Sequence, residues 1–357
     1  MFDFLCFMSL KWKFIVNPNA GSQLCTKRWE KAEPVIKKSG IDYDVVLTTG
    51  RAQGQDITKQ AIKDGFNRII VASGDGVVNE AINGIMSFPE EKRKSVAFGV
   101  LPFGTGNDLC TFMGMPWNPE NAARTLIEKT AVSPASIGHV KYQDTKFEVF
   151  FGNSFDFGIS SLVNIANLEG EMRWIKGPSK YTFLALKKLA TVKQRKGTIT
   201  LDDGEPMDFR LMLVAIGIGK SLGGGMLSCV NAHPQNDFFD VFISRDMTKF
   251  QTLLGIQKIF KGEHLNLKGA EYKYAKKVEV ELESEIGHEH DGEIYEGDFS
   301  SHCVVTHLPQ AYNVLYNVDH PSMIWLSAEE LASGKKPDGK ATKNMSHWDG
   351  RTWMEKN

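Results

Sequence analysis

Cysteine is scarce in this chain: there are five among 357 residues, an odd number with no regular spacing. No disulfide framework is therefore expected, and a reducing, cytoplasmic environment is favoured. Net charge is also nearly absent, at −1 at neutral pH. Proteins that bind nucleic acid usually carry a strong basic excess, so nucleic acid is not an expected partner.

Long hydrophobic runs are missing as well. The apolar start, residues 1–10, has no basic leading region and is far shorter than the roughly 20 residues of a membrane-spanning helix. We expect a flexible or surface-packed extension there, with membrane contact as the alternative. The hydrophobic share of 42% in 357 residues still allows a large core, and this length suggests two domains.

Two glycine-rich turns are the most informative features that the chain does contain. Residues 73–76 (SGDG) follow the apolar run 68–72, and residues 104–108 (GTGND) follow the apolar run 96–101. Glycine lets backbone N–H groups approach a polyanion closely, and a helix that begins beyond the turn adds a positive dipole end. Both turns therefore indicate phosphate binding.

The context of these turns strengthens this interpretation. Residues 77–85 after the first turn carry apolar residues at helical spacing, which gives a strand, a glycine turn and a helix in succession. A third polar loop, residues 17–22, follows the strand-like run 13–16. Each turn alone could be a mere tight connection between elements. In a parallel sheet, however, such loops gather at the carboxyl ends of the strands and would share one cleft.

Four strings in the chain resemble motifs of the diacylglycerol-kinase-like lipid kinases, a family that includes bacterial diacylglycerol kinases, sphingosine kinases and ceramide kinases. The strings are residues 16–21 (VNPNAG), 73–80 (SGDGVVNE), 101–109 (LPFGTGNDL) and 291–293 (DGE). Their order and spacing also fit, so the resemblance extends over about residues 12 to 316.

The resemblance implies an α/β N-terminal domain with a parallel sheet, of the NAD kinase/diacylglycerol kinase-like type, and a mainly β C-terminal domain built as a sandwich. Residues 12–135 would form the nucleotide-binding domain, completed by about 304–316. Residues 136–303 would form the lipid-acceptor domain, and 317–357 a C-terminal tail. The charged and apolar residues that alternate in 277–282 independently predict a half-buried strand in the second domain.

The activity that the resemblance implies is transfer of the γ-phosphoryl group of ATP to a lipid hydroxyl, with Mg²⁺ as the metal. Thr48 matches a family threonine at the nucleotide, although threonine at a strand end needs no such role. The positions that match the family's nucleotide-binding residues are Asn17, Pro18, Gly21, Thr48, Ser73, Gly74, Gly76, Asn79, Glu80, Gly104, Thr105, Gly106, Asn107 and Asp108.

The catalytic candidates are Asp291, Asp75 and Glu293. Phosphoryl transfer needs charge neutralisation and a base for the attacking hydroxyl, and carboxylates such as Asp75 and Asp108 suit Mg²⁺. The resemblance makes Asp291 the first choice for the base and Asp75 the second.

Two histidines beside Asp291 raise a zinc alternative. His288 and His290 would point to the same face of a strand, but zinc needs at least a third ligand nearby. We expect an exposed polar loop at these histidines instead.

Several departures from the family pattern leave the substrate open. Ser73 is shared with sphingosine kinases, and Val77 replaces a usual threonine. Asp237 matches a family aspartate that holds a structural Mg²⁺, but Phe238 stands where glycine is usual. The favoured function is a lipid kinase with a diacylglycerol-like acceptor. The alternatives are a sphingoid-base or ceramide kinase, an NAD kinase, and an inactive lipid- or nucleotide-binding module.

The expected partners are ATP and a lipid substrate met at the membrane surface, with a homodimer as a further expectation from the relatives. A predicted amphipathic helix over 181–192 and the apolar residues Phe155, Phe157, Ile159 and Leu162 are candidates for lipid-tail contact. Packing in the core is the stronger alternative for such apolar stripes. A run of basic residues over 187–196 could face anionic headgroups or simply be solvated.

Overall fold

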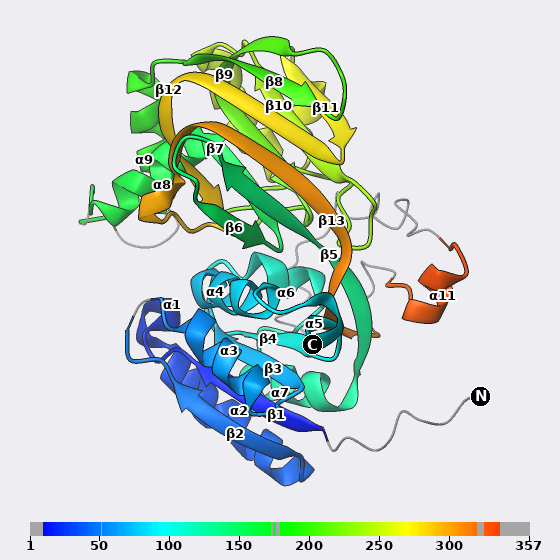
Figure 1. Cartoon of the computed structure of the whole chain (residues 1–357). Helices are drawn as coiled ribbons and strands as arrows, with labels where there is room; N and C mark the ends of the chain where they lie inside the picture. Colours follow the sequence, from blue (N-terminus) through cyan, green and yellow to red (C-terminus); the bar gives the residue numbers. More distant parts are fainter. Residues whose placement is uncertain (1–9, 51, 173, 176–178, 320–324, 336–357) are drawn as a thin grey trace. The chain divides into compact units, whose positions relative to one another are not determined.

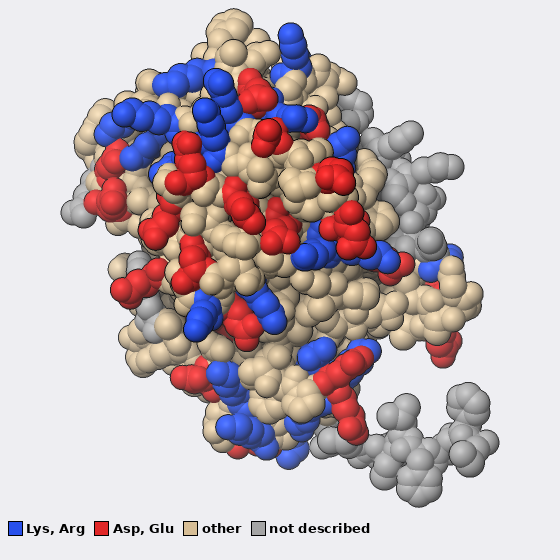
Figure 2. Space-filling view, turned by 45° about the horizontal axis from the view of Figure 1, so that its top comes forward, with Lys and Arg blue, Asp and Glu red and all other residues tan. Residues whose placement is uncertain are grey.

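The computed structural model describes residues 10–50, 52–172, 174–175, 179–319 and 325–335 (Figure 1). The expectations for the apolar start up to residue 9 and for the tail from residue 336 lie outside these residues. The described chain forms two compact units. The first comprises residues 10–134 and 311–330, and the second comprises 135–310 and 331–335. Basic and acidic side chains are interspersed over the face shown in Figure 2, in keeping with the small net charge.

The first unit is built on a parallel sheet with the strand order β13-β4-β3-β1-β2. Every residue of β4 is buried, as are residues 69–73 of β3. Continuously buried strands of this kind need helices on both faces, which is the pattern of α/β proteins. The strands are β1 (Lys11–Val16), β2 (Asp42–Leu47), β3 (Arg68–Ser73), β4 (Ala97–Pro102) and the end of β13 (Phe299–Asn317).

Helices α1 to α7 of the first unit connect these strands and cover the sheet. Helices α3 and α4 pack closely, because a Cβ on Gly84 of α4 would lie 2.8 Å from Cβ of Thr58 of α3. The helices are α1 (Ala20–Gln23), α2 (Cys25–Ser39), α3 (Gly54–Lys63), α4 (Asp75–Met86), α5 (Glu90–Lys94), α6 (Asp108–Phe112) and α7 (Pro119–Glu128). Helix α11 (Ala328–Ala332) follows the last strand and crosses the boundary between the units.

Part of the predicted tail belongs to the first unit. Leu326 is buried, and the indole of Trp325 stacks on Tyr316 with ring centroids 5.2 Å apart. The indole N–H of Trp325 also donates to the carbonyl of Phe112 at 3.2 Å. Residue 317 itself ends β13. The beginning of the predicted C-terminal tail therefore packs against the first unit.

The second unit is an antiparallel β-sandwich, as expected. One layer has the order β11-β10-β9-β7-β12, and the other runs through β9, β8, β12, β13, β5 and β6. Strands β9 and β12 belong to both layers, because their two ends pair with different neighbours. The remaining strands are β5 (Thr130–Tyr142), β6 (Glu148–Phe151), β7 (Ser154–Gly158), β8 (Lys196–Leu201), β9 (Met207–Gly217), β10 (Phe239–Arg245), β11 (Ala270–Ala275) and β12 (Lys277–His290).

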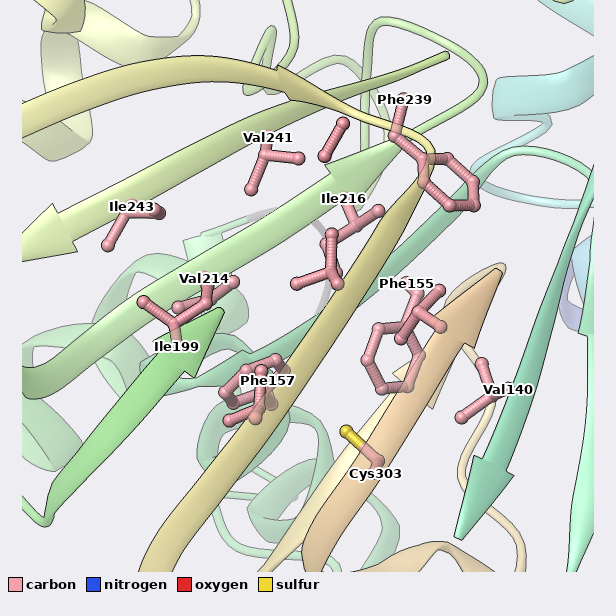
Figure 3. Packing of buried hydrophobic residues seen from close by; sticks show 14 of the residues in the cluster. Val140, Phe155, Phe157, Ile199, Val214, Ile216, Phe239, Val241, Ile243 and Cys303 are labelled. Carbon is pink, nitrogen blue, oxygen red and sulfur yellow. The ribbon is translucent and has the colours of Figure 1, made fainter. Parts of the chain in front are cut away.

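The core of the second unit lies between these layers and is rich in aromatic residues. Figure 3 shows Phe155, Phe157 and Phe239 among aliphatic side chains from several strands. Phe155 and Phe157 are completely buried, which supports the core alternative over lipid contact for these two residues.

Helices lie outside the strands of the second unit: α8 (Ile159–Leu168), α9 (Ser179–Thr191) and α10 (Lys249–Ile259), with the short 3-10 turns η1 (His264–Asn266) and η2 (Glu296–Asp298). The predicted helix over 181–192 corresponds to α9. Helix α9 contacts both α8 and α10. No helix in the described part of the chain has the length and apolar character needed to cross a bilayer.

Candidate functional site

Asp75 joins the two glycine-rich loops of the first unit. Strand β3 ends at Ser73, Gly74 is extended, and α4 begins at Asp75. The Asp75 carboxylate accepts hydrogen bonds from the backbone N–H groups of Asn107 at 2.8 Å and Asp108 at 3.2 Å. The two turns are therefore in direct contact at the carboxyl ends of β3 and β4.

Glycine is required where these loops meet. A Cβ on Gly104 would lie 2.2 Å from Cα of Gly74, and a Cβ on Gly106 would lie 2.7 Å from a carboxylate oxygen of Asp75. No side chain fits at such distances without a backbone shift. Loop-to-loop packing is thus a second reason for these glycines, beside the close approach of a phosphate.

Asn107 closes the second loop on itself. Its backbone is left-handed, with φ of 56°, and its side chain is completely buried. The side-chain oxygen accepts from the N–H of Gly104 at 3.0 Å, and the side-chain amide donates to the carbonyl of Gly104 at 3.1 Å. Asn107 therefore fixes the shape of the loop.

The third polar loop meets the second. A Cβ on Gly21, whose φ is +60°, would lie 2.6 Å from the carbonyl oxygen of Phe103. Arg28 of α2 donates from its guanidinium to the carbonyl of Gly104 at 3.0 Å. Arg28 was not among the predicted site residues, because no local pattern marks a basic residue in the first turn of a helix as a partner of a distant loop.

Glu80 joins α4 to the start of α3, and Asn79 is buried within α4. The Glu80 carboxylate accepts from the N–H groups of Ala52 at 3.0 Å and Gly54 at 2.7 Å, at the start of α3. Asn79 is buried, and its side-chain oxygen accepts from the Asn83 amide at 3.2 Å. The Glu80 contacts fasten α4 to α3, and a role of the two residues at the nucleotide stays a prediction.

The remaining predicted nucleotide residues lie around this group of loops. Asn17 donates its backbone N–H to Ala72 at 3.2 Å, and Thr48 donates its own to Val16 at 2.9 Å. Pro18 is partly exposed, Thr105 is exposed, and Thr48 and Ser73 are buried. Gly76 lies in the first turn of α4.

Negative charge is concentrated at the junction of the glycine loops. The pKa of the Cys110 thiol is raised far above its usual value, mainly by burial and further by the charges of Asp75 and Asp108. Two carboxylates beside glycine loops and the start of a long helix form a donor set that fits a nucleotide phosphate with a hard cation.

Asp291 of the second unit is held by backbone donors. It follows β12 in a left-handed conformation, with φ of 53°, and is almost fully buried. Its carboxylate accepts from the N–H groups of Gly152 at 2.9 Å, Asn153 at 2.7 Å and Ser154 at 3.0 Å. Donors of this kind stabilise the charged form of a carboxylate and fix its orientation.

Asn153 was not among the predicted site residues. Its side-chain amide donates to the carbonyl of Ser221 at 2.9 Å, and its carbonyl accepts from Ile218 at 2.9 Å and Gly219 at 2.8 Å. Asn153 therefore links the backbone that holds Asp291 to the loop after β9. The Gly-Asn dipeptide between two strand-like runs is a turn signal that could have drawn attention to it.

Glu293 closes the turn that contains Asp291. Its N–H donates to the carbonyl of His290 at 3.0 Å, and the N–H of His290 donates back to Glu293 at 2.9 Å. Beside this turn, Glu289 of β12 pairs with Asp156 of β7. Burial raises the pKa of Glu289 well above its usual value, and the nearby Asp156 raises it further.

The expectation of an exposed loop at His288 and His290 is wrong, because both lie on β12 and are buried. Their rings continue the aromatic core: His288 stacks on Phe155 with centroids 5.4 Å apart. In the described residues, the one group of three side chains placed to hold a metal is Glu279, Glu281 and His302. The two core histidines are not part of it, which argues against zinc at these positions.

Asp237 lies in the loop before β10 and is exposed. The neighbouring Phe238 packs edge-on against Tyr274, with ring centroids 5.0 Å apart. The ring contact with Tyr274 accommodates Phe238 at the position where the family pattern has glycine. A metal ion at Asp237 stays a prediction.

Comparisons with known proteins cover both units. The family model described as the diacylglycerol kinase catalytic domain matches residues 11–140, and the YegS C-terminal NAD kinase beta sandwich-like domain matches residues 153–316.

Among curated proteins, the chain is similar to the diacylglycerol kinase of Mycobacterium tuberculosis strain H37Rv, with 27% identity over 267 residues, 75% of this chain and 84% of the relative. The diacylglycerol kinase of Bacillus subtilis strain 168 is 24% identical over 319 residues, 89% of this chain and 98% of the relative. A crystal structure of a diacylglycerol kinase from Bacillus anthracis strain Sterne aligns with a TM-score of 0.66 and 22% identity, covering 87% of this chain and 97% of that one. At this identity the structural likeness concerns the fold.

Proposed function

Because this chain belongs to the diacylglycerol-kinase-like family of lipid kinases, we propose that it transfers the γ-phosphoryl group of ATP to the hydroxyl of a diacylglycerol-like lipid. The observation that carries the proposal is the Asp75 carboxylate, which ties together two glycine loops of the kind that bind phosphate.

The first unit supplies the nucleotide site in this proposal. The phosphates would lie against the two glycine turns, where no side chain holds them off, and the start of α4 at Asp75 would add its positive dipole end. Bound Mg²⁺ would neutralise phosphate charge, and Asp75 and Asp108 are the carboxylates suited to hold it. Arg28 keeps the second loop in position through the carbonyl of Gly104.

Asp291 is the proposed base. It would accept the proton of the lipid hydroxyl as the hydroxyl oxygen attacks the γ-phosphorus and ADP leaves, and three backbone N–H groups orient its carboxylate. Asp75 is the second candidate for this role. Glu293 holds the turn in which Asp291 lies.

The proposed setting is cytoplasmic, with the enzyme bound at the periphery of a membrane where its lipid resides. ATP and the lipid are the proposed partners, and the homodimer remains a prediction. A sphingoid base or ceramide is the alternative acceptor, since Ser73 at the first loop is shared with sphingosine kinases.

The direct test is phosphate transfer from labelled ATP by the purified protein, with diacylglycerol, sphingosine, ceramide and NAD offered separately as acceptors. We expect label in phosphatidic acid. Label on NAD would favour an NAD kinase instead. Tight ATP binding without transfer to any acceptor would favour an inactive binding module and contradict the proposal.

Two aspartate variants separate binding from chemistry. Asp291→Asn should lower the turnover number by about 10²- to 10⁴-fold, the usual contribution of a general base, with ATP affinity unchanged. Asp75→Asn should weaken ATP binding itself, because it loosens the contact between the loops. The matched control is Asp203→Asn, at an exposed aspartate after β8. Loss of turnover with intact ATP binding in Asp75→Asn, together with an active Asp291→Asn, would reverse the two assignments.

A further inference from the structure

Helix α10 exposes an apolar stripe to solvent. Phe250 is 68% exposed, Leu253 40%, Leu254 45% and Phe260, directly after the helix, 53%. These positions recur at helical spacing, so they share one face. A surface helix ordinarily turns polar residues outward, and an apolar face left outside marks an interaction surface.

The exposure is not due to a poorly anchored helix. The opposite face packs inward, with Ile259 buried and Ile256 against the cluster that contains Leu189 and Met212. Thr248 and Gln251 form a capping box at the first turn. The helix is therefore fixed to the unit with its apolar stripe directed away from it.

The charges along α10 have one sign. Between Thr248 and Gly262 the sequence contains Lys249, Lys258 and Lys261 and no acidic residue. None of these lysines makes an ion pair within the residues that the structure describes. On the neighbouring α9, by contrast, Lys187 and Lys188 both pair with Glu171. Lys249 donates to the carbonyl of Ala190 at 2.6 Å, so the charges of Lys258 and Lys261 are the ones left for an external partner.

We propose that the outer face of α10 docks onto a bilayer that contains anionic lipids, with its apolar side chains in the interface and its lysines at the headgroups. The proposal rests on the proposed function in that the acceptor is a membrane lipid, and it names the surface that reaches it. Exposed aromatic and aliphatic residues flanked by lysines are typical of helices that lie in the plane of a membrane interface.

A second copy of the chain is the weaker occupant. A two-fold interface would bring the same face of both copies together, and therefore lysines against lysines, with no acid between Thr248 and Gly262 to offset them. An anionic membrane complements both the apolar stripe and its charge.

The test is co-sedimentation of the full chain with vesicles of phosphatidylcholine, with and without phosphatidylglycerol, in the absence of ATP and acceptor. We expect binding to the anionic vesicles. The double variant Phe250→Ser/Leu254→Ser should weaken it by about tenfold or more, as expected when apolar side chains leave the interface. Lys258→Gln/Lys261→Gln should lose mainly the preference for anionic vesicles.

The control is Val318→Ser, which removes an apolar side chain that is 54% exposed on the first unit. It should bind as the unchanged protein does. All variants alter exposed or partly exposed side chains, and unchanged circular dichroism and thermal unfolding would confirm that they fold.

Outcomes for the docking surface and for the proposed function separate clearly. Phosphate transfer to a short-chain diacylglycerol in detergent micelles should be unchanged in the α10 variants. Vesicle binding without any transfer would overturn the proposed function and leave the docking surface in place. Equal binding by the double variant and the unchanged protein, or a dimer that the double variant dissociates in analytical ultracentrifugation, would overturn the docking surface.

Discussion

At the scale of single residues, Asn153 is the position at which a substitution should reveal how Asp291 is held. Its backbone N–H contacts the carboxylate, while its side chain and carbonyl fasten the loop after β9. Asn153→Ala removes the amide that donates to Ser221 and leaves that buried carbonyl without this donor, a loss of about 1–3 kcal/mol. The backbone around residues 152–154 should then hold Asp291 less precisely.

We expect Asn153→Ala to lower the turnover number about tenfold or more, since a small misplacement of a catalytic group is costly, while KM for ATP stays constant. Steady-state kinetics on the full chain measures both values. Asn266→Ala, at an exposed residue of η1, is the control. An increase in KM for ATP without a change in turnover would show that Asn153 acts on the nucleotide site instead.

The site residues that could be predicted stand in short sequence motifs, whereas those that could not be predicted contact residues far away in the chain. Asp75, Gly104 and Asp291 stand in short strings whose residue types already indicate their chemistry. Arg28 and Asn153 act through partners 76 and 68 positions away. Such contacts exist only once the chain has folded, so no local pattern marks them.

At the scale of the element, the end of strand β12 is polar in sequence and nevertheless buried in the structure. The beginning of β12, residues 277–282, was predicted as a strand from its alternation, but its end was expected to be an exposed loop because it reads Glu-Ile-Gly-His-Glu-His. Imidazole rings can stack on aromatic rings, and His288 and His290 both face Phe155. Histidine counts as a polar residue in a sequence pattern, but a buried imidazole packs like an aromatic ring, so the pattern predicted exposure where the structure has burial.

The burial of His288 has a consequence for stability in acid. Burial lowers its pKa from 6.5 to about 4. Between these values the unfolded chain binds a proton that the folded chain does not, so the free energy of unfolding falls as the pH drops from about 6.5 to 4. His264 and His307, also lowered to about 4 by burial, act in the same direction.

His288→Phe should remove one of these protons and keep the ring contact with Phe155. We expect the dependence of the unfolding free energy on pH to become shallower by about 1.4 kcal/mol per pH unit within this window. Guanidinium unfolding followed by circular dichroism at pH 7, 6 and 5 measures it. Parallel curves for the variant and the unchanged protein would show that His288 takes up its proton in the folded state as well.

At the scale of the whole molecule, the fold class of each unit could be predicted from the sequence, but the pairing of its strands could not. The family resemblance of the glycine loops implied an α/β unit and a sandwich, and the alternation over residues 277–282 independently predicted a strand of the second unit. The exchange of β9 and β12 between two layers depends on pairings of residues far apart in the chain, such as Val278 with Leu201 and His288 with Phe157. Periodicity predicts that a strand exists and which residues alternate, but it does not identify the neighbours.

The stability of the whole chain should report nucleotide binding independently of turnover. A ligand that binds only the folded state stabilises it by about 2.7 kcal/mol at a hundredfold excess over its Kd, which corresponds to a shift of a few degrees in Tm. Mg²⁺ with a nonhydrolysable ATP analogue should therefore raise Tm for the unchanged protein. Because Asp291 is proposed to act on the lipid hydroxyl, Asp291→Asn should show the same shift.

Gly104→Ala should lose that shift, since a Cβ there would lie 2.2 Å from Cα of Gly74 and must push the two loops apart. The matched control is Gly65→Ala, where a Cβ meets nothing within 4 Å, so that any cost of its positive φ appears in Tm without ligand. Differential scanning fluorimetry with and without the analogue separates the two effects. A full ligand shift in Gly104→Ala would mean that the nucleotide binds away from the junction of the loops, and the first unit would then need a different assignment.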